Sequence, residues 1–248
     1  MYSRQLGTGA TCRRCTLIVL SAILGWILCA CANTPTYVVL SGGGSDSPSG
    51  SPSSPGEVII IGDSSTAGTK FGGQGAANWA TIVVNRLADE GNVTSVIVDG
   101  KGGSGYLKVG LEGTTFVTET DRLVDSDTVG VLYFGSSNDV DVAGDVATAV
   151  SRCAQIIKQR SPNARVIAVG PAWSRAEPYT PNLLDYVATL DDAWGAEGAT
   201  FVDPLSEDWL GDRVGMVGGD GVHPTDRAHS IYADRMYPLV KQLAAQRP

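Results

Sequence analysis

The sequence predicts an α/β fold built on a mainly parallel β-sheet of five strands. Short apolar runs, typical of buried parallel strands, occur after residue 56 at 58–61, 96–98, 129–134, 166–169 and 200–202. Between them lie stretches with the apolar spacing of amphipathic helices. Strands that alternate with helices favour right-handed crossovers and a parallel sheet, in which ligands bind beyond the carboxyl ends of the strands.

The spacing of apolar residues predicts the helices that connect these strands. The expected helical segments are 79–87, 146–157, 183–194 and 228–239. Cys153 lies on the apolar face of the second segment and is expected to be a small buried residue. Pro238 is expected to kink the last helix, because proline cannot donate a helical hydrogen bond.

Residues 1–31 have the composition of an export signal. Arg13 and Arg14 precede the uncharged stretch 16–30, whose 15 residues are short for a membrane span and suit a signal peptide. The stretch ends in Leu28-Cys29-Ala30-Cys31, which resembles the lipobox of bacterial lipoproteins and places lipid attachment on Cys31. An ordinary cleaved signal or an uncleaved anchor helix are the alternatives.

The next segment, 32–56, is predicted to be a flexible linker, and 57–248 to be the folded domain. Positions 41–56 are Ser, Gly or Pro at 15 of 16 places, a composition that cannot build a core. Without residues 1–31 the chain has 15 basic and 26 acidic residues, a net charge of −11 that argues against a nucleic-acid partner. We expect an exported monomer, held by lipid on the outer face of the cell membrane or else secreted.

Four short motifs follow the domain's predicted strands or precede its last helix. In chain order they are Gly62-Asp63-Ser64, the glycine Gly105, Gly135-Ser136-Ser137-Asn138-Asp139 and Asp220-Gly221-Val222-His223. Together they provide a serine, hydrogen-bond donors and an acid–base pair, which are the groups required for acyl transfer through a serine nucleophile.

Each motif predicts a separate role. Asp220 and His223 are close enough in sequence to share one loop, with the carboxylate holding the imidazole Nδ1–H while Nε2 faces Ser64. The other histidine, His229, lies in the expected last helix and is interpreted as structural. The side chain of Asn138 and the backbone N–H of Gly105 are candidate donors to a developing oxyanion.

Other nucleophile, nucleotide and metal sites do not fit the sequence. The glycine-rich run at 102–105 lacks the Lys-Ser/Thr of a phosphate-binding loop and opens no helix with an acidic residue about 20 positions on. The sequence contains no Gly-x-Ser-x-Gly elbow and no cluster of metal-ligating residues. Neither a cofactor nor a metal is therefore expected.

With these motifs, residues 57–245 resemble the SGNH hydrolases, also called the GDSL esterase/lipase family. The resemblance implies a flavodoxin-like three-layer α/β/α sandwich. It also implies that Ser64 is the nucleophile, that His223 is the base, and that the oxyanion donors are the Ser64 N–H, Gly105 and Asn138. Ser65 stands where the family often has Leu, and the Asn138 motif is one residue longer than the frequent Gly-x-Asn-Asp.

The sequence therefore predicts a serine esterase that acts on carboxylic O-acyl esters. The same residues would serve an acyltransferase of the cell envelope, and a non-catalytic envelope-binding domain is a weaker alternative because no member of the predicted triad is missing. Small acyl esters, acylated glycans and lipid esters all stay open as substrates. Trp173, Tyr179 and Trp209 are candidates to line the substrate site.

Overall fold

The computed structural model describes residues 36–38, 56–92, 94–175 and 177–245 of the chain. The predicted export signal, the lipidation site Cys31 and most of the predicted linker lie outside the described residues. No helix in the described ranges is both long and apolar enough to cross a membrane.

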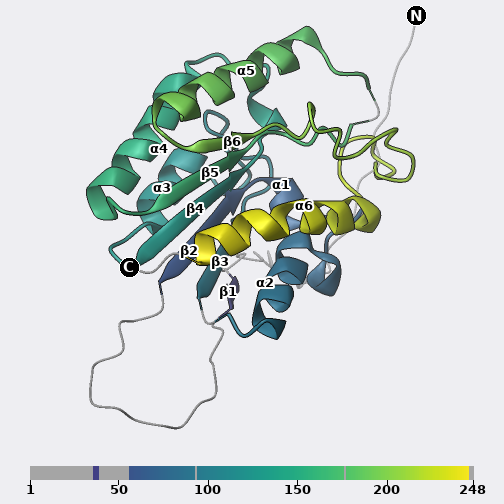
Figure 1. Ribbon diagram of the computed structural model, residues 1–248. Coiled ribbons are helices and arrows are strands. Elements are labelled where there is room, and N and C mark those ends of the chain that lie inside the picture. Colours follow the sequence, from purple (N-terminus) through teal and green to yellow (C-terminus); the bar gives the residue numbers. More distant parts are fainter. Residues whose placement is uncertain (1–35, 39–55, 93, 176, 246–248) are drawn as a thin grey trace, which may run out of the picture. The chain divides into compact units, whose positions relative to one another are not determined.

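A six-stranded sheet forms the middle layer, with the strand order β1-β3-β2-β4-β5-β6 (Figure 1). Five strands are parallel, as predicted: β2 (Glu57–Gly62), β3 (Ser95–Gly100), β4 (Thr128–Phe134), β5 (Arg165–Val169) and β6 (Thr200–Val202). The strand β1 (Thr36–Val38) pairs antiparallel to β3 and was not predicted. Three residues inside a segment rich in Ser, Gly and Pro carry no periodicity that would identify a strand.

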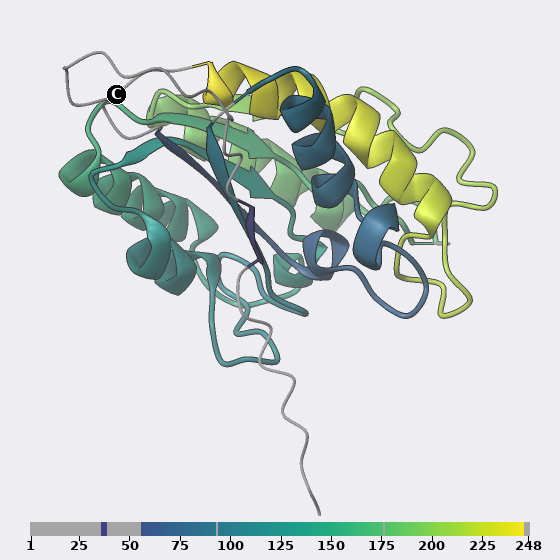
Figure 2. The same ribbon diagram turned by 90° about the horizontal axis from the view of Figure 1, so that it is seen from below.

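Helices cover both faces of the sheet, which confirms the predicted three-layer α/β arrangement (Figures 1 and 2). The described helices are α1 (Ser64–Ala67), α2 (Trp79–Asp89), α3 (Phe116–Leu123), α4 (Val146–Arg160), α5 (Pro181–Ala196) and α6 (Asp226–Ala244), with 3₁₀ turns η1 (Gly75–Ala77) and η2 (Ser137–Asp139). The helix α3 was not predicted, because five of its eight residues are threonine or charged. The helix α6 continues past Pro238.

Each face of the sheet buries its own apolar core. Along β2, Val58 and Ile60 pack toward α2 and α6, whereas Ile59 and Ile61 pack toward α3, α4 and α5. All four side chains are fully buried, as a parallel strand between two helical layers requires. Cys153 is buried in the second core, as predicted, and burial raises the pKa of its thiol to about 11.

The carboxyl ends of the three central strands lie in register. Gly62 at the end of β2 pairs with Gly100 of β3 on one side and with Phe134 of β4 on the other. A Cβ on Gly62 would lie 2.1 Å from Thr66 Oγ1, so only glycine lets the chain turn directly from β2 into α1. The segments that follow these strands therefore meet at one edge of the sheet.

Candidate active site

The turn from β2 into α1 places Ser64 at the first position of a helix. Asp63 is the N-cap residue: its Oδ1 accepts the Ser65 N–H at 2.8 Å, and its carbonyl accepts the N–H groups of Thr66 and Ala67. The Ser64 amide makes no hydrogen bond within the described part of the chain. A half-buried serine with a free backbone donor therefore lies at the end of the central strand.

The carboxyl group of Asp63 is buried beside this serine. Burial raises the pKa of Asp63, while the hydrogen bond from the Ser65 amide, the neighbouring Ser136 side chain and the charge of His223 lower it. Ser174 lines a cavity together with Asp63 and Ser65, and its hydroxyl donates to the carbonyl of Val222 on the loop before α6. That loop therefore lies close to the serine turn, although more than 150 residues separate the two in sequence.

His223 and Asp220 form a close pair on that loop. The Asp220 Oδ2 lies 2.6 Å from His223 Nδ1, and its Oδ1 accepts the N–H groups of Val222 and His223, both at 3.1 Å. Partial desolvation opposes these contacts, but the hydrogen bonds lower the pKa of Asp220 to about 2. Asp220 is therefore ionised at neutral pH and holds the imidazole by Nδ1, which leaves Nε2 for another partner.

Contacts from neighbouring loops support the imidazole. The ring of Phe71 lies parallel to that of His223, with centroids 6.2 Å apart. Ser174 Oγ donates a hydrogen bond of 2.7 Å to the carbonyl of Val222. No hydrogen bond joins the Ser64 hydroxyl to His223 among the described residues. Hydrogen bonds between a nucleophile and its base are often long or poorly aligned without substrate and tighten only when it binds.

Asn138 lies on η2, at the end of β4. Its Nδ2 donates to the Ser104 carbonyl at 2.9 Å, and a second, longer contact of 3.4 Å reaches Asp63 Oδ2. The short bond fixes the orientation of the amide. The long one is weak, so the second hydrogen of the amide is available to a stronger acceptor.

The third predicted donor, Gly105, is used differently. Its N–H donates to the Lys108 carbonyl at 3.0 Å and is not free for an oxyanion in this structure. A Cβ at this position would lie 2.4 Å from both carboxylate oxygens of Asp139. Glycine is required here because the Asp139 carboxylate packs directly against the backbone.

Asp139 was not assigned a role from the sequence. Its carboxylate accepts the backbone N–H groups of Tyr106, Leu107 and Lys108 and the hydroxyl of Tyr186. The Asn-Asp pair was visible in the motif, but nothing in the local sequence indicates contacts to a loop more than 30 residues away.

His229 is fully buried, as its apolar neighbours predict. Its Nδ1 accepts the Trp79 N–H at 3.4 Å, and burial lowers its pKa to about 4 against a small opposing effect of Asp226. His229 is therefore neutral at physiological pH and packs between α6 and the start of α2.

The three aromatic candidates have different positions. Trp173 is buried and lines a cavity of about 20 Å³ together with Asp63 and Ser65, so it lies beside the serine turn. Tyr179 is 39% exposed and packs under the guanidinium group of Arg213. Trp209 lies in the core between the sheet and α6 and does not line this cavity.

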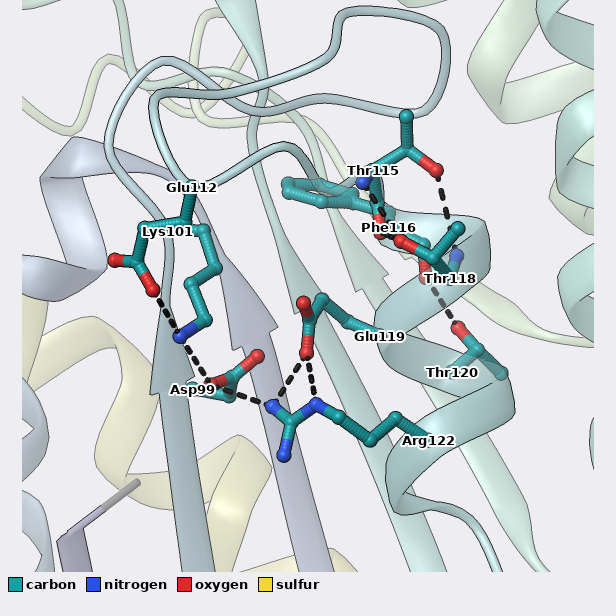
Figure 3. A network of polar contacts seen from close by, with 9 residues as sticks. All are labelled: Asp99, Lys101, Glu112, Thr115, Phe116, Thr118, Glu119, Thr120 and Arg122. Atoms are coloured by element: carbon teal, nitrogen blue, oxygen red, sulfur yellow. Dashed lines mark hydrogen bonds and ion pairs between the residues drawn. The ribbon is translucent and has the colours of Figure 1, made fainter. Parts of the chain in front are cut away.

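A network of charged residues anchors the segment between β3 and α3, which carries Gly105 (Figure 3). The buried Asp99 on β3 contacts Lys101 at 3.5 Å and Arg122 of α3 at 2.9 Å. Arg122 also pairs with the buried Glu119, and Lys101 binds Glu112 at 2.7 Å. Two cations thus hold the loop against both the strand and the helix.

This network predicts a pH-dependent stability. Burial, together with the neighbouring Glu119, raises the pKa of Asp99 to about 6 against the attraction of Arg122 and Lys101. The folded protein therefore keeps this proton when the unfolded chain has lost it, so the contribution of Asp99 to stability falls as pH rises from about 4 to about 6.

Asp99→Asn lacks this titration. Relative to wild type, the free energy of unfolding of this variant is expected to rise between pH 4 and pH 7. The rise is at most about 3 kcal/mol, because the lowered pKa of Glu119 gives stability a pH dependence of the opposite sign. Urea unfolding of both proteins at pH 4, 5.5 and 7 measures the change. A difference that is constant across this range would contradict the assignment.

Comparison with known proteins agrees with the geometry. The GDSL-like lipase/acylhydrolase family matches residues 60–231. The chain belongs to this family. A GDSL lipase of Mycobacterium tuberculosis is 35% identical over 191 residues, which cover 74% of this chain and 80% of the relative. The esterase TesA of Pseudomonas aeruginosa is 23% identical over 189 residues, with 75% and 88% covered.

Solved structures of two esterases show the same fold. A crystal structure of TesA superposes with a TM-score of 0.59 at 20% identity, over 75% of this chain and 99% of that one. The psychrotrophic esterase EstA of Pseudoalteromonas gives 0.58 at 16% identity, with 77% and 100% covered. This GDSL-family protein is therefore an SGNH-type hydrolase with an α/β fold.

Proposed function

We propose that this hydrolase is a serine esterase that cleaves O-acyl esters through Ser64, His223 and Asp220. The single observation that carries the proposal is the Asp220–His223 pair on a loop that Ser174 links to a helix-initial serine whose backbone N–H is free. Either feature alone is common, whereas together they provide a nucleophile, its base, the residue that orients the base and one oxyanion donor.

In the proposed reaction, the Ser64 hydroxyl attacks the ester carbonyl while His223 Nε2 takes its proton. Asp220 holds the ring by Nδ1 and stabilises the imidazolium that forms. The carbonyl oxygen becomes an oxyanion, bound by the Ser64 N–H and the Asn138 amide. His223 then protonates the leaving alcohol, and it next activates the water that releases the carboxylic acid and restores Ser64.

Gly105 is a weaker candidate for the oxyanion hole. Its N–H joins the other two donors only if its hydrogen bond to the Lys108 carbonyl opens when substrate binds. The proposed oxyanion hole therefore has two donors that need no rearrangement, the Ser64 N–H and the Asn138 amide. Gly105 is a third donor that requires a local rearrangement.

Hydrolysis and acyl transfer use the same residues and differ in the acceptor. Structural relatives include carbohydrate esterases, such as one of family 3 from Talaromyces cellulolyticus, with a TM-score of 0.56 at 16% identity. Acylated glycans are therefore included among the proposed substrates, with water as the acceptor. The test is to supply p-nitrophenyl esters of graded chain length, with and without a sugar acceptor. Free carboxylic acid as the main product supports the esterase, whereas an acylated sugar as the main product supports an acyltransferase.

We also propose that the protein is exported and anchored by lipid at Cys31. The proposal rests on the short apolar stretch that ends in Leu28-Cys29-Ala30-Cys31 and on the Ser/Gly/Pro-rich segment after it. More than one acyl chain on Cys31 would hold the protein at a membrane without an apolar patch on the domain.

Cys31→Ser is expected to move the protein out of the membrane fraction or to leave it as an unprocessed precursor. Intact-mass analysis of the wild-type membrane fraction should give a mature chain that begins at a lipid-modified Cys31. A mature chain that begins elsewhere, or an unmodified Cys31, would contradict the anchor and leave the proposed esterase activity unaffected.

A further inference from the structure

We propose that Asp139 is a positioning residue that orients the oxyanion donor Asn138 through the loop around Gly105. The inference rests on the proposed function, because it assigns Asp139 a part in the same reaction. Asp139 does not touch the reacting atoms in this arrangement, and its effect passes through the backbone of a neighbouring loop.

The Asp139 carboxylate binds the loop of 104–108 through hydrogen bonds from its backbone. Its Oδ2 accepts the Tyr106 N–H at 2.7 Å, and its Oδ1 accepts those of Leu107 and Lys108 at 3.1 and 2.7 Å. The Tyr186 hydroxyl adds a fourth bond at 3.0 Å. The carboxylate is only 2% exposed, so these donors, rather than water, satisfy it.

The same loop in turn contacts Asn138. The Ser104 carbonyl, immediately before Gly105, accepts the Asn138 Nδ2–H and the Ser136 hydroxyl, each at 2.9 Å. The bond to this carbonyl is the shorter of the two that the Asn138 amide donates, and it fixes the orientation of the amide. The position of the carbonyl depends on the loop of 104–108, which Asp139 binds through three consecutive N–H groups.

The close packing of the two motifs explains why both are needed. Gly105 lies between the Ser104 carbonyl and the three bound amides, and a Cβ there would lie 2.4 Å from the Asp139 carboxylate. Any larger residue at position 105 would therefore keep the Asp139 carboxylate from the backbone N–H groups of 106–108. Asp139 and Gly105 form one contact that sets the distance between the loop and η2, on which Asn138 lies.

Asp139→Asn tests the proposal with a side chain of the same size. All four partners of Asp139 are hydrogen-bond donors, and the NH₂ group of asparagine cannot accept from them. The variant therefore keeps fewer of the bonds to the loop. We expect kcat to fall by roughly 10- to 100-fold with KM within about twofold, because an oxyanion donor acts mainly in the transition state. The matched control is Tyr186→Phe, which removes only the fourth bond and should keep kcat within about threefold.

A double-mutant cycle separates positioning from a purely structural effect. Asn138→Ala should lower kcat by about 10²- to 10³-fold. If Asp139 acts through Asn138, adding Asp139→Asn to Asn138→Ala should lower kcat little further. Asp139→Glu keeps a carboxylate and should recover part of the kcat that Asp139→Asn loses. Circular dichroism and thermal melts confirm that each variant is folded.

Independent effects of the two substitutions would overturn the proposal, as would a folded Asp139→Asn enzyme with wild-type kcat. If Asp139→Asn does not fold, the cycle is repeated with Asp139→Glu, and effects that multiply with those of Asn138→Ala would again overturn it. Failure of the proposed function gives a different result, since Ser64→Ala would then keep its activity.

Discussion

Ser64→Ala is expected to lose ester hydrolysis, with kcat at least about 10³-fold below wild type. The structure gives two reasons: Ser64 occupies the helix-initial position at the end of β2, and its own N–H is free to bind the oxyanion. Removing Oγ leaves the backbone donor and the fold in place, so the loss should be in kcat and not in the thermal midpoint. Initial rates on a p-nitrophenyl ester measure it.

Ser65→Ala is the matched control for this substitution. Ser65 is the next residue of the same helix, and its backbone N–H, which alanine keeps, makes the 2.8 Å bond to Asp63 Oδ1. The variant should therefore keep most of its activity. Loss of activity in Ser65→Ala with retention in Ser64→Ala would show that the nucleophile has been assigned to the wrong residue.

His223→Ala is expected to be nearly as inactive as Ser64→Ala, because no other described histidine lies close to the serine turn and carries a carboxylate partner. Asp220→Asn should cost less, since Asp220 orients the ring and stabilises its charge without itself taking a proton. Rates at saturating substrate for both variants give the comparison. Equal activity of His223→Ala and wild type would eliminate the proposed triad.

His229→Ala is the control for the base. His229 is buried and packs closely against Gly73, so its removal should lower the thermal midpoint. The kcat of the folded fraction should stay close to wild type. A strong loss of kcat in fully folded His229→Ala would place the base on α6 and not on the preceding loop.

The sequence was most informative where the structure is regular. All five parallel strands were recognisable as short apolar runs. The central ones were clearest, because a strand buried on both faces is apolar at nearly every position, as in β4, where all seven residues are buried. The short edge strand β1 and the polar helix α3 were missed for the opposite reason. Backbone pairing stabilises β1, and α3 is fixed by its Thr115–Thr118 capping box and a few buried positions.

At the site, local motifs were predictable and contacts between motifs were not. Asp220 and His223 lie in one short loop, so their pairing followed from sequence spacing. The role of Gly105 depends on Asp139, 34 positions later, and on the Lys108 carbonyl. No pattern within a single motif shows that a glycine is required by a distant carboxylate, so only the three-dimensional structure identified that contact.

Covalent labelling tests the central claim most directly. An aryl phosphonate should react once with the wild-type protein and release one equivalent of phenol, because the phosphonyl group transfers to the nucleophile and mimics the tetrahedral intermediate. Peptide mass mapping is expected to place the adduct on Ser64, with no adduct in Ser64→Ala and slow labelling in His223→Ala. An adduct on another residue, or an active enzyme that forms none, would contradict acyl transfer through Ser64.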